Sequence, residues 1–148
     1  MNSKTKLFND DRFLNLNEAK KSGAVVMAND ALSSKVGFRI DVVYSSACFE
    51  RHVQWLVGSP CQNQTGREWD VLMLSALALH MNVNEAGQAN TKIESVPPGG
   101  ESPQHDELRV SWLGDEDDEP VVLVMLIHET VSGINRRAAV TTAGANHV

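Results

Sequence analysis

The most constraining feature of the sequence is a run of seven apolar residues at positions 121–127, VVLVMLI. A strand with one face in water alternates apolar and polar residues, because successive side chains point to opposite faces. The absence of alternation predicts a strand with neighbours on both faces or both edges. We expect it to lie centrally in a sheet, between strands at residues 108–113 and 38–44.

The composition is that of one ordinary domain, with 148 residues, 42% of them hydrophobic and 22% charged. A chain of this size buries roughly two thirds of its unfolded surface, so its core needs no disulfide or structural metal. The first residues lack the apolar region of a secretory signal, and no apolar run approaches the roughly 20 residues that span a bilayer. We therefore expect a cytoplasmic protein with no membrane contact, in which Cys48 and Cys61 are free thiols.

Turn and capping residues divide the N-terminal half into elements. Residues 15–21 predict a short helix that ends at Gly23. Alternation over residues 38–44 predicts a strand entered through Gly37, and a helix over about 46–57 follows.

A second helix is predicted over residues 66–82. It begins with a capping box, in which the Thr65 hydroxyl bonds the Glu68 amide and the Glu68 carboxylate returns to the Thr65 amide. Apolar residues then run almost all round it from Trp69 to Met81, which predicts a helix covered on most of its surface and central to the core.

The C-terminal half contains three strand-like runs at hairpin spacing, at residues 91–96, 108–113 and 121–127. Together these elements predict an α+β domain at residues 24–129, with an antiparallel sheet of about four strands and two helices packed on one face. Residues 1–23 form a basic segment with a short helix outside the core. Residues 130–148 are rich in small residues without a sustained period, so we expect a disordered tail.

Two motifs carry a family resemblance, GREWDVL at residues 66–72 and DDEPV at residues 117–121. With the strand and helix that precede them, they resemble a bacterial family catalogued only as domain of unknown function 6573, over about residues 24–130. This chain departs from the family pattern at Leu126, Ile127 and His128, where we expect Leu-Pro-Gly. The resemblance implies the fold and, through the usual setting of such genes, an accessory role in mobile genetic elements.

Four side chains are weak candidates for a catalytic site, namely Cys48, His52, Asp70 and His80. Cys48 and His52 stand four apart on one predicted helix and so share a face. With Cys61 and His80 they could form a tetrahedral zinc site, but no paired Cys-x-x-Cys element is present, and we expect no metal and no cofactor. The favoured interpretation is a packed thiol beside a partly buried imidazole. The alternative, a small enzyme, requires at least three of the four candidates to converge in one cavity.

Five residues at the start of the second helix are predicted to be structural: Thr65, Arg67, Glu68, Trp69 and Asp70. Arg67 and Asp70 are three apart and can form an ion pair on the helix surface. The apolar pattern places three tryptophans on inward faces, Trp55, Trp69 and Trp112. We therefore expect their side chains to be buried in the core.

The acidic run Asp115, Glu116, Asp117, Asp118 and Glu119 is the candidate interaction site, because adjacent carboxylates create a concentrated negative field. A solvated hairpin turn is the competing interpretation. The chain shows no phosphate loop and no recognisable triad, so we expect a non-enzymatic protein that binds a protein partner. As an accessory factor of a mobile element it could oppose host defence by presenting carboxylates in place of phosphates.

Nucleic-acid binding is the remaining alternative. The formal charge of −6 argues against it, although basic residues outnumber acidic ones over positions 1–39. The groups that would bind phosphates are Lys4, Lys6, Arg12, Lys20 and Lys21.

Overall fold

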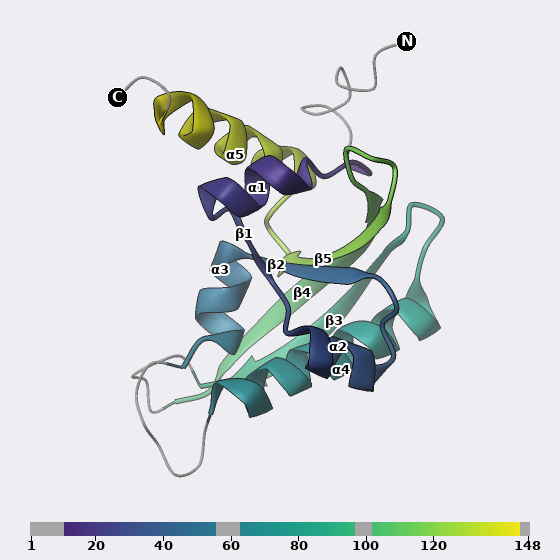
Figure 1. The fold of residues 1–148 in the computed structure, drawn as a ribbon. Helices are drawn as coiled ribbons and strands as arrows, with labels where there is room; N and C mark the ends of the chain where they lie inside the picture. The colour runs from purple at the N-terminus through teal and green to yellow at the C-terminus, as the bar shows by residue number, and fades with distance from the viewer. Residues whose placement is uncertain (1–10, 56–62, 97–101, 146–148) are drawn as a thin grey trace.

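One five-stranded sheet lies between two layers of helices in the computed structural model, which describes residues 11–55, 63–96 and 102–145 (Figure 1). The elements in chain order are α1 (Leu16–Ser22), β1 (Val25–Met27), α2 (Asp30–Val36), β2 (Asp41–Ser45), α3 (Ser46–Cys48), η2 (Phe49–Val53), α4 (Gln64–Asn82), β3 (Gln88–Ser95), β4 (Gln104–Gly114), β5 (Pro120–Leu126) and α5 (Val131–Ala145).

The strand order is β1-β2-β5-β4-β3, which places the apolar run at the centre of the sheet. β5 pairs antiparallel with β4 and parallel with β2, where Val42 lies opposite Val122. The predicted central position of this strand is confirmed. The prediction of an antiparallel sheet of about four strands matches only roughly, because β2 runs parallel to β5 and β1 adds a fifth strand.

The side chains of β5 alternate between two separate hydrophobic cores. Val122, Val124 and Leu126 pack on the side of α4, and the other core receives Val121, Leu123 and Met125. All six are buried. Cover on both faces therefore explains why the run lacks polar positions.

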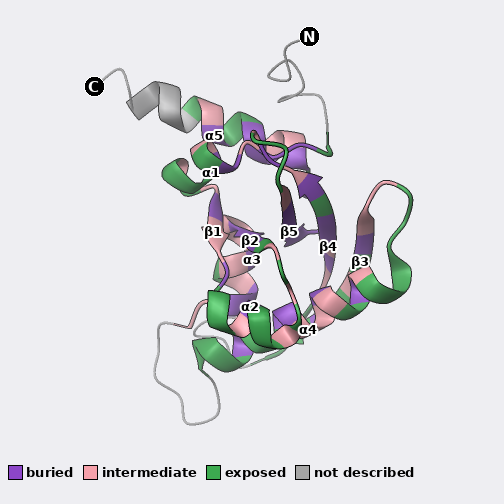
Figure 2. Ribbon diagram, turned by 45° about the vertical axis from the view of Figure 1, so that its right-hand side comes forward, coloured by how far each residue is buried: buried purple, intermediate pink, exposed green. Residues whose placement is uncertain are grey.

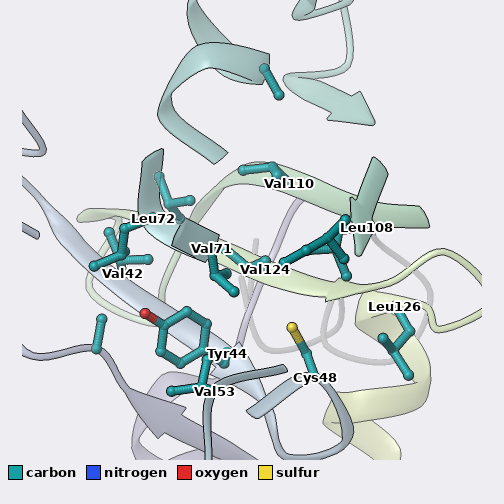
Figure 3. Packing of buried hydrophobic residues seen from close by; sticks show 14 of the residues in the cluster. Val42, Tyr44, Cys48, Val53, Val71, Leu72, Leu108, Val110, Val124 and Leu126 are labelled. Carbon is teal, nitrogen blue, oxygen red and sulfur yellow. The ribbon is translucent and has the colours of Figure 1, made fainter. Parts of the chain in front are cut away.

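The core on the side of α4 is closed by residues from three parts of the chain. Figure 3 shows Tyr44 of β2, Val71 of α4 and Cys48 of α3 gathered against the sheet. The hydroxyl of Tyr44 donates to Glu68 Oε2 at 2.8 Å, and the Asn29 amide donates to the same oxygen at 2.9 Å. Because Glu68 is turned inward, it does not return to the Thr65 amide, and the predicted capping box is wrong.

The opposite face of the sheet is covered by α1 and α5, which corrects two predictions. The C-terminal tail is a helix from Val131 to Ala145, and Ile134 and Ala138 on it are buried. The described part of the N-terminal segment, residues 11–23, also joins this core, through Leu14 and through Leu16 and Ala19 of α1. Among the small residues of the C-terminal tail is a short apolar stripe at helical spacing. It stabilises the helix only by packing against β5.

Polar side chains attach the segment before α1 and the start of α5 to this layer. Asn135 donates from its Nδ2 to the carbonyl of Phe13 at 2.8 Å and accepts from the Asn15 amide at 2.8 Å. Glu129 accepts from the Ser45 hydroxyl at 2.6 Å and from the Leu126 amide at 2.9 Å. These bonds hold the start of α5 against the ends of β2 and β5.

The expected strand over residues 38–44 begins only at Asp41. Gly37, which we expected at the strand's entrance, instead ends α2 in the left-handed region, with φ 118°. The elements β1 and α2 were not predicted, because each is too short to show a clear period. The short helix before Gly23 is confirmed as α1.

α4 matches the predicted helix within two residues, but its cap and its surroundings differ from the prediction. Asn63 is the N-cap, with its side chain accepting from the Gly66 amide at 2.6 Å. The helix is not covered all round, since Leu77 is 49% and Met81 is 71% exposed. Figure 2 shows exposed and intermediate positions along its outer side.

Two of the three tryptophans are not core anchors. Trp69 is 36% and Trp112 is 50% exposed, and Trp55 is half-buried. Trp112 follows the period of Leu108 and Val110, as predicted, but it lies where α4 does not fully cover the sheet.

The role of α5 predicts a contrast between two residues of that helix. Ile134→Ala removes a fully buried side chain, and we expect a loss of about 2–5 kcal/mol of unfolding free energy. Val140→Ala changes a side chain that is 72% exposed, and we expect a change within about 0.5 kcal/mol. Urea unfolding measures both, and equal effects of the two substitutions would contradict the packing of α5 on the sheet.

Candidate functional site

One polar cluster in the described residues joins a histidine, a serine and an aspartate. His52 Nδ1 lies 2.5 Å from Ser95 Oγ, and His52 Nε2 lies 2.7 Å from Asp106 Oδ2. The imidazole is fully buried, whereas the Asp106 side chain is 22% exposed and Ser95 is half-buried. The cluster therefore runs from the core towards the surface.

A π-helical turn supplies the histidine. The Ser45 hydroxyl accepts from the Cys48 amide at 3.1 Å and starts α3, and the chain then widens into η2, where the Gln54 amide bonds the Phe49 carbonyl at 2.7 Å. Such turns are rare and often occur at functional sites. Arg51, the neighbour of His52 in this turn, also binds Asp106, through its Nε.

The β3–β4 hairpin supplies the serine and the aspartate. Its register pairs Ser95 with Gln104 and Ile93 with Asp106. Residues opposite each other share a face of the sheet, so Ser95 and Asp106 point to the same side on neighbouring strands. Sequence reasoning missed both, because the register of the hairpin could not be read across its long loop.

The hydrogen bonds assign the roles of the two ring nitrogens. A carboxylate only accepts, so Nε2 of His52 donates to Asp106, and in the neutral ring Nδ1 accepts from the Ser95 hydroxyl. Burial lowers the pKa of His52 and outweighs the opposing effect of Asp106, and the charges of Arg51 and Arg67 lower it further. The site therefore holds a neutral imidazole against a hydroxyl.

Arg67 joins this turn to the end of β3. Its Nη1 donates to the Val96 carbonyl at 2.6 Å, its Nη2 donates to the Arg51 carbonyl at 3.0 Å, and its guanidinium lies 5.0 Å from the ring centre of Trp55. Burial lowers the pKa of Arg67. Arg67 and Asp70 are both described, and they do not form the predicted ion pair. The Asp70 side chain is exposed. The structural role of Arg67 thus depends on backbone carbonyls.

The four candidate catalytic residues do not converge. Cys48 is a free, fully buried thiol whose pKa is raised by burial. Asp70 and His80 are both exposed and lie ten positions apart on α4, which is about 15 Å along a helix. Only His52 belongs to the polar cluster, so these four residues do not form one site. Cys61, the further zinc candidate, lies outside the described residues.

The acidic run is partly engaged by the fold. Glu116 accepts from the amides of Leu16 and Asn17, at 2.8 and 3.1 Å, and so caps α1. Asp115 is buried and accepts from two amides of its own turn, at 2.8 and 3.0 Å. These bonds account for the closeness of the carboxylates of residues 115–117. The exposed members of the run are Asp117, Asp118 and Glu119.

The basic residues of the nucleic-acid alternative are divided between two regions. Lys20 and Lys21 are exposed on the last turn of α1, and Arg12 is exposed shortly before it. Lys4 and Lys6 lie outside the described residues.

A second candidate site is an apolar hollow of about 630 Å³ beside α4. Its walls come from α4, from the segment between α2 and β2, and from β4. They include Phe38, Met73, Leu77, His80, Val83 and Trp112. His80 is the one ionisable side chain among its described lining residues.

Comparison with known protein families, curated proteins and solved structures found no match for this chain. Its function is therefore inferred from its own geometry, and the likeness to the bacterial family stays a prediction. Among the helices of the described residues, none has both the length and the apolar character needed to cross a bilayer.

The buried histidine predicts a specific pH dependence of stability. Because the folded state holds the pKa of His52 below its ordinary 6.5, the unfolded chain takes up a proton first as the pH falls below that value. The contribution of His52 is thus present above pH 6.5 and lost as the pH falls towards its lower folded pKa.

We expect His52→Gln to flatten the loss of unfolding free energy between about pH 7.5 and pH 5.5. The matched control is His80→Gln, which changes an exposed histidine and keeps the wild-type slope. Urea unfolding at the two pH values measures the slopes, and a wild-type slope in His52→Gln would count against the buried neutral imidazole.

Proposed function

We propose that this chain is a protein-interaction module that binds an apolar helical segment of a partner protein in the hollow beside α4. The observation that carries the proposal is the concentration of exposed apolar side chains there. Six large apolar side chains are exposed in the described residues, and Leu77, Val83 and Trp112 among them line this one hollow.

Such exposure favours binding on energetic grounds. Fully burying one large apolar side chain stabilises by about 1.5–3 kcal/mol, so a cluster left in water is a source of binding energy. Contiguous exposed apolar patches on a single chain usually mark interaction sites. Trp112 is half exposed at the wall of the hollow, and tryptophan is enriched among the residues that dominate binding energy.

The shape and charge of the hollow favour an apolar helix. Met73, Leu77 and His80 recur along α4 at helical spacing and form a stripe that a second helix can pack against. No Lys, Arg, Asp or Glu lines the hollow among the described residues, so it offers nothing to pair with a charged group. Gly87 lets the chain before β3 lie close against Trp112 at the edge of the hollow, since a Cβ there would lie 3.1 Å from the Trp112 carbonyl oxygen.

The acidic run lies outside this hollow and shares no described residue with it. The carboxylates of Asp115 and Glu116 are bonded to backbone amides, and their geometry serves the fold. An accessory role in a mobile element, which the family resemblance implies, is compatible with a module that binds another protein.

Selection from a displayed library of helical peptides tests the proposal. We expect peptides with apolar residues at positions i, i+3 or i+4, and i+7 to be enriched on the wild-type chain. Leu77→Ala and Trp112→Ala should each weaken binding of the selected peptides about tenfold or more, which corresponds to about 1.4 kcal/mol. Fluorescence anisotropy measures the dissociation constants.

The matched control is Met81→Ala. Met81 is 71% exposed on the same helix and does not line the hollow, so we expect its substitution to leave binding unchanged. The proposal fails if no peptide is enriched, or if selected peptides bind Leu77→Ala and Met81→Ala equally well.

A further inference from the structure

We infer that Ser95, His52 and Asp106 form a nucleophilic serine site that cleaves small carboxylic esters. A hydroxyl, a base and a carboxylate that orients the base are joined in series by contacts of 2.5 and 2.7 Å. This series is what activation of a serine requires, because the base must reach the hydroxyl proton and must itself be held in one tautomer. The site is separate from the apolar hollow and shares no described residue with it.

The carboxylate is placed to do both tasks of an orienting group. Asp106 fixes the proton of His52 on Nε2, which leaves the lone pair of Nδ1 directed at Ser95. When the ring takes the serine proton it becomes a cation inside the core, and Asp106 is the opposite charge in contact with it. Arg51 binds the same oxygen of Asp106, Oδ2, through its Nε and restricts its position.

Ser95 and Asp106 are the members of the series with exposed surface, and Ser95 is the nucleophile of the two. It is the last residue of β3, the outermost strand on its side of the sheet, and it is half-buried whereas the imidazole is fully buried.

In the described part of the chain, one buried donor without a hydrogen-bond partner belongs to a residue that contacts Arg67, the side chain bonded to the end of β3. The indole N–H of Trp55 is buried and has no hydrogen-bond partner among the described residues. Trp55 packs on Arg67, whose Nη1 bonds the carbonyl of Val96, the residue after Ser95. A preorganised donor of this kind lowers the barrier when it faces an oxyanion.

The reaction balances without any further reagent than water. Ser95 Oγ attacks the ester carbonyl carbon while its proton passes to His52 Nδ1; the bond from carbon to the alkoxy oxygen then breaks, and the alcohol leaves with that proton. Water next attacks the acyl group on Ser95, giving one proton to Nδ1, and the carboxylic acid leaves as that proton returns to Oγ.

A fluorophosphonate probe tests the site on the full chain, since it bonds to an activated serine oxygen and releases fluoride. We expect peptide mapping to find the probe on Ser95. Ser102, an exposed serine in the same hairpin connection, is the internal control and should stay unlabelled. This comparison needs no variant and so does not depend on the folding of one.

Variants then separate an activated serine from a structural hydrogen bond. His52→Gln should slow labelling at least 100-fold, and Asp106→Asn, which keeps the size of the side chain, at least 10-fold. Ser95→Ala should abolish the hydrolysis of p-nitrophenyl acetate, and Ser102→Ala should leave it unchanged. Labelling of Ser95 no faster than Ser102, or labelling that is insensitive to His52→Gln in a folded variant, would overturn the inference and leave the cluster a structural tie.

Discussion

The packing of β5 between two helical layers is the constraint on which the rest of the structure depends. The side chains of residues 121–126 alternate between the two faces of the sheet, and all six are buried. Burying one large apolar side chain stabilises the fold by about 1.5–3 kcal/mol. A strand with no polar face has to be covered on both sides, so the chain places α4 on one side and α1 with α5 on the other. Both helical layers are therefore required to bury the side chains of β5.

The two candidate sites arise because α4 covers its face of the sheet unevenly. At its first turns, Arg67 reaches the carbonyl of Val96 and joins the π-helical turn to the end of β3, beside Ser95 and His52. At its last turns the helix leaves Leu77 and Trp112 exposed round the hollow. One helix therefore connects a polar cluster and an apolar surface at opposite ends.

Particular residues show how far the sequence could predict this arrangement. The central position of residues 121–127 followed from their unbroken apolar run, and the helix that became α4 followed from its apolar residues although its predicted cap was wrong. The structured C-terminal helix was missed because its apolar stripe is short. Val131, Ile134 and Ala138 are the buried apolar residues where burial on α5 is described, and they are too few to recognise without the surface they pack on. His52 was singled out for its chemistry, but its expected neighbours were the wrong ones, since helical spacing relates residues of one helix and not those of a distant hairpin.

The sequence by itself determined which segments are helix or strand where a period persists, and which strand lies at the centre, because burial on both faces leaves a local mark on every position of that strand. Only the tertiary structure decided that β2 runs parallel to β5, that α5 covers the second face, and that His52 meets Ser95 and Asp106. These outcomes depend on strand register and on contacts between segments far apart in the chain. A hydrogen-bond partner is chosen by position in space, and no local pattern encodes that position.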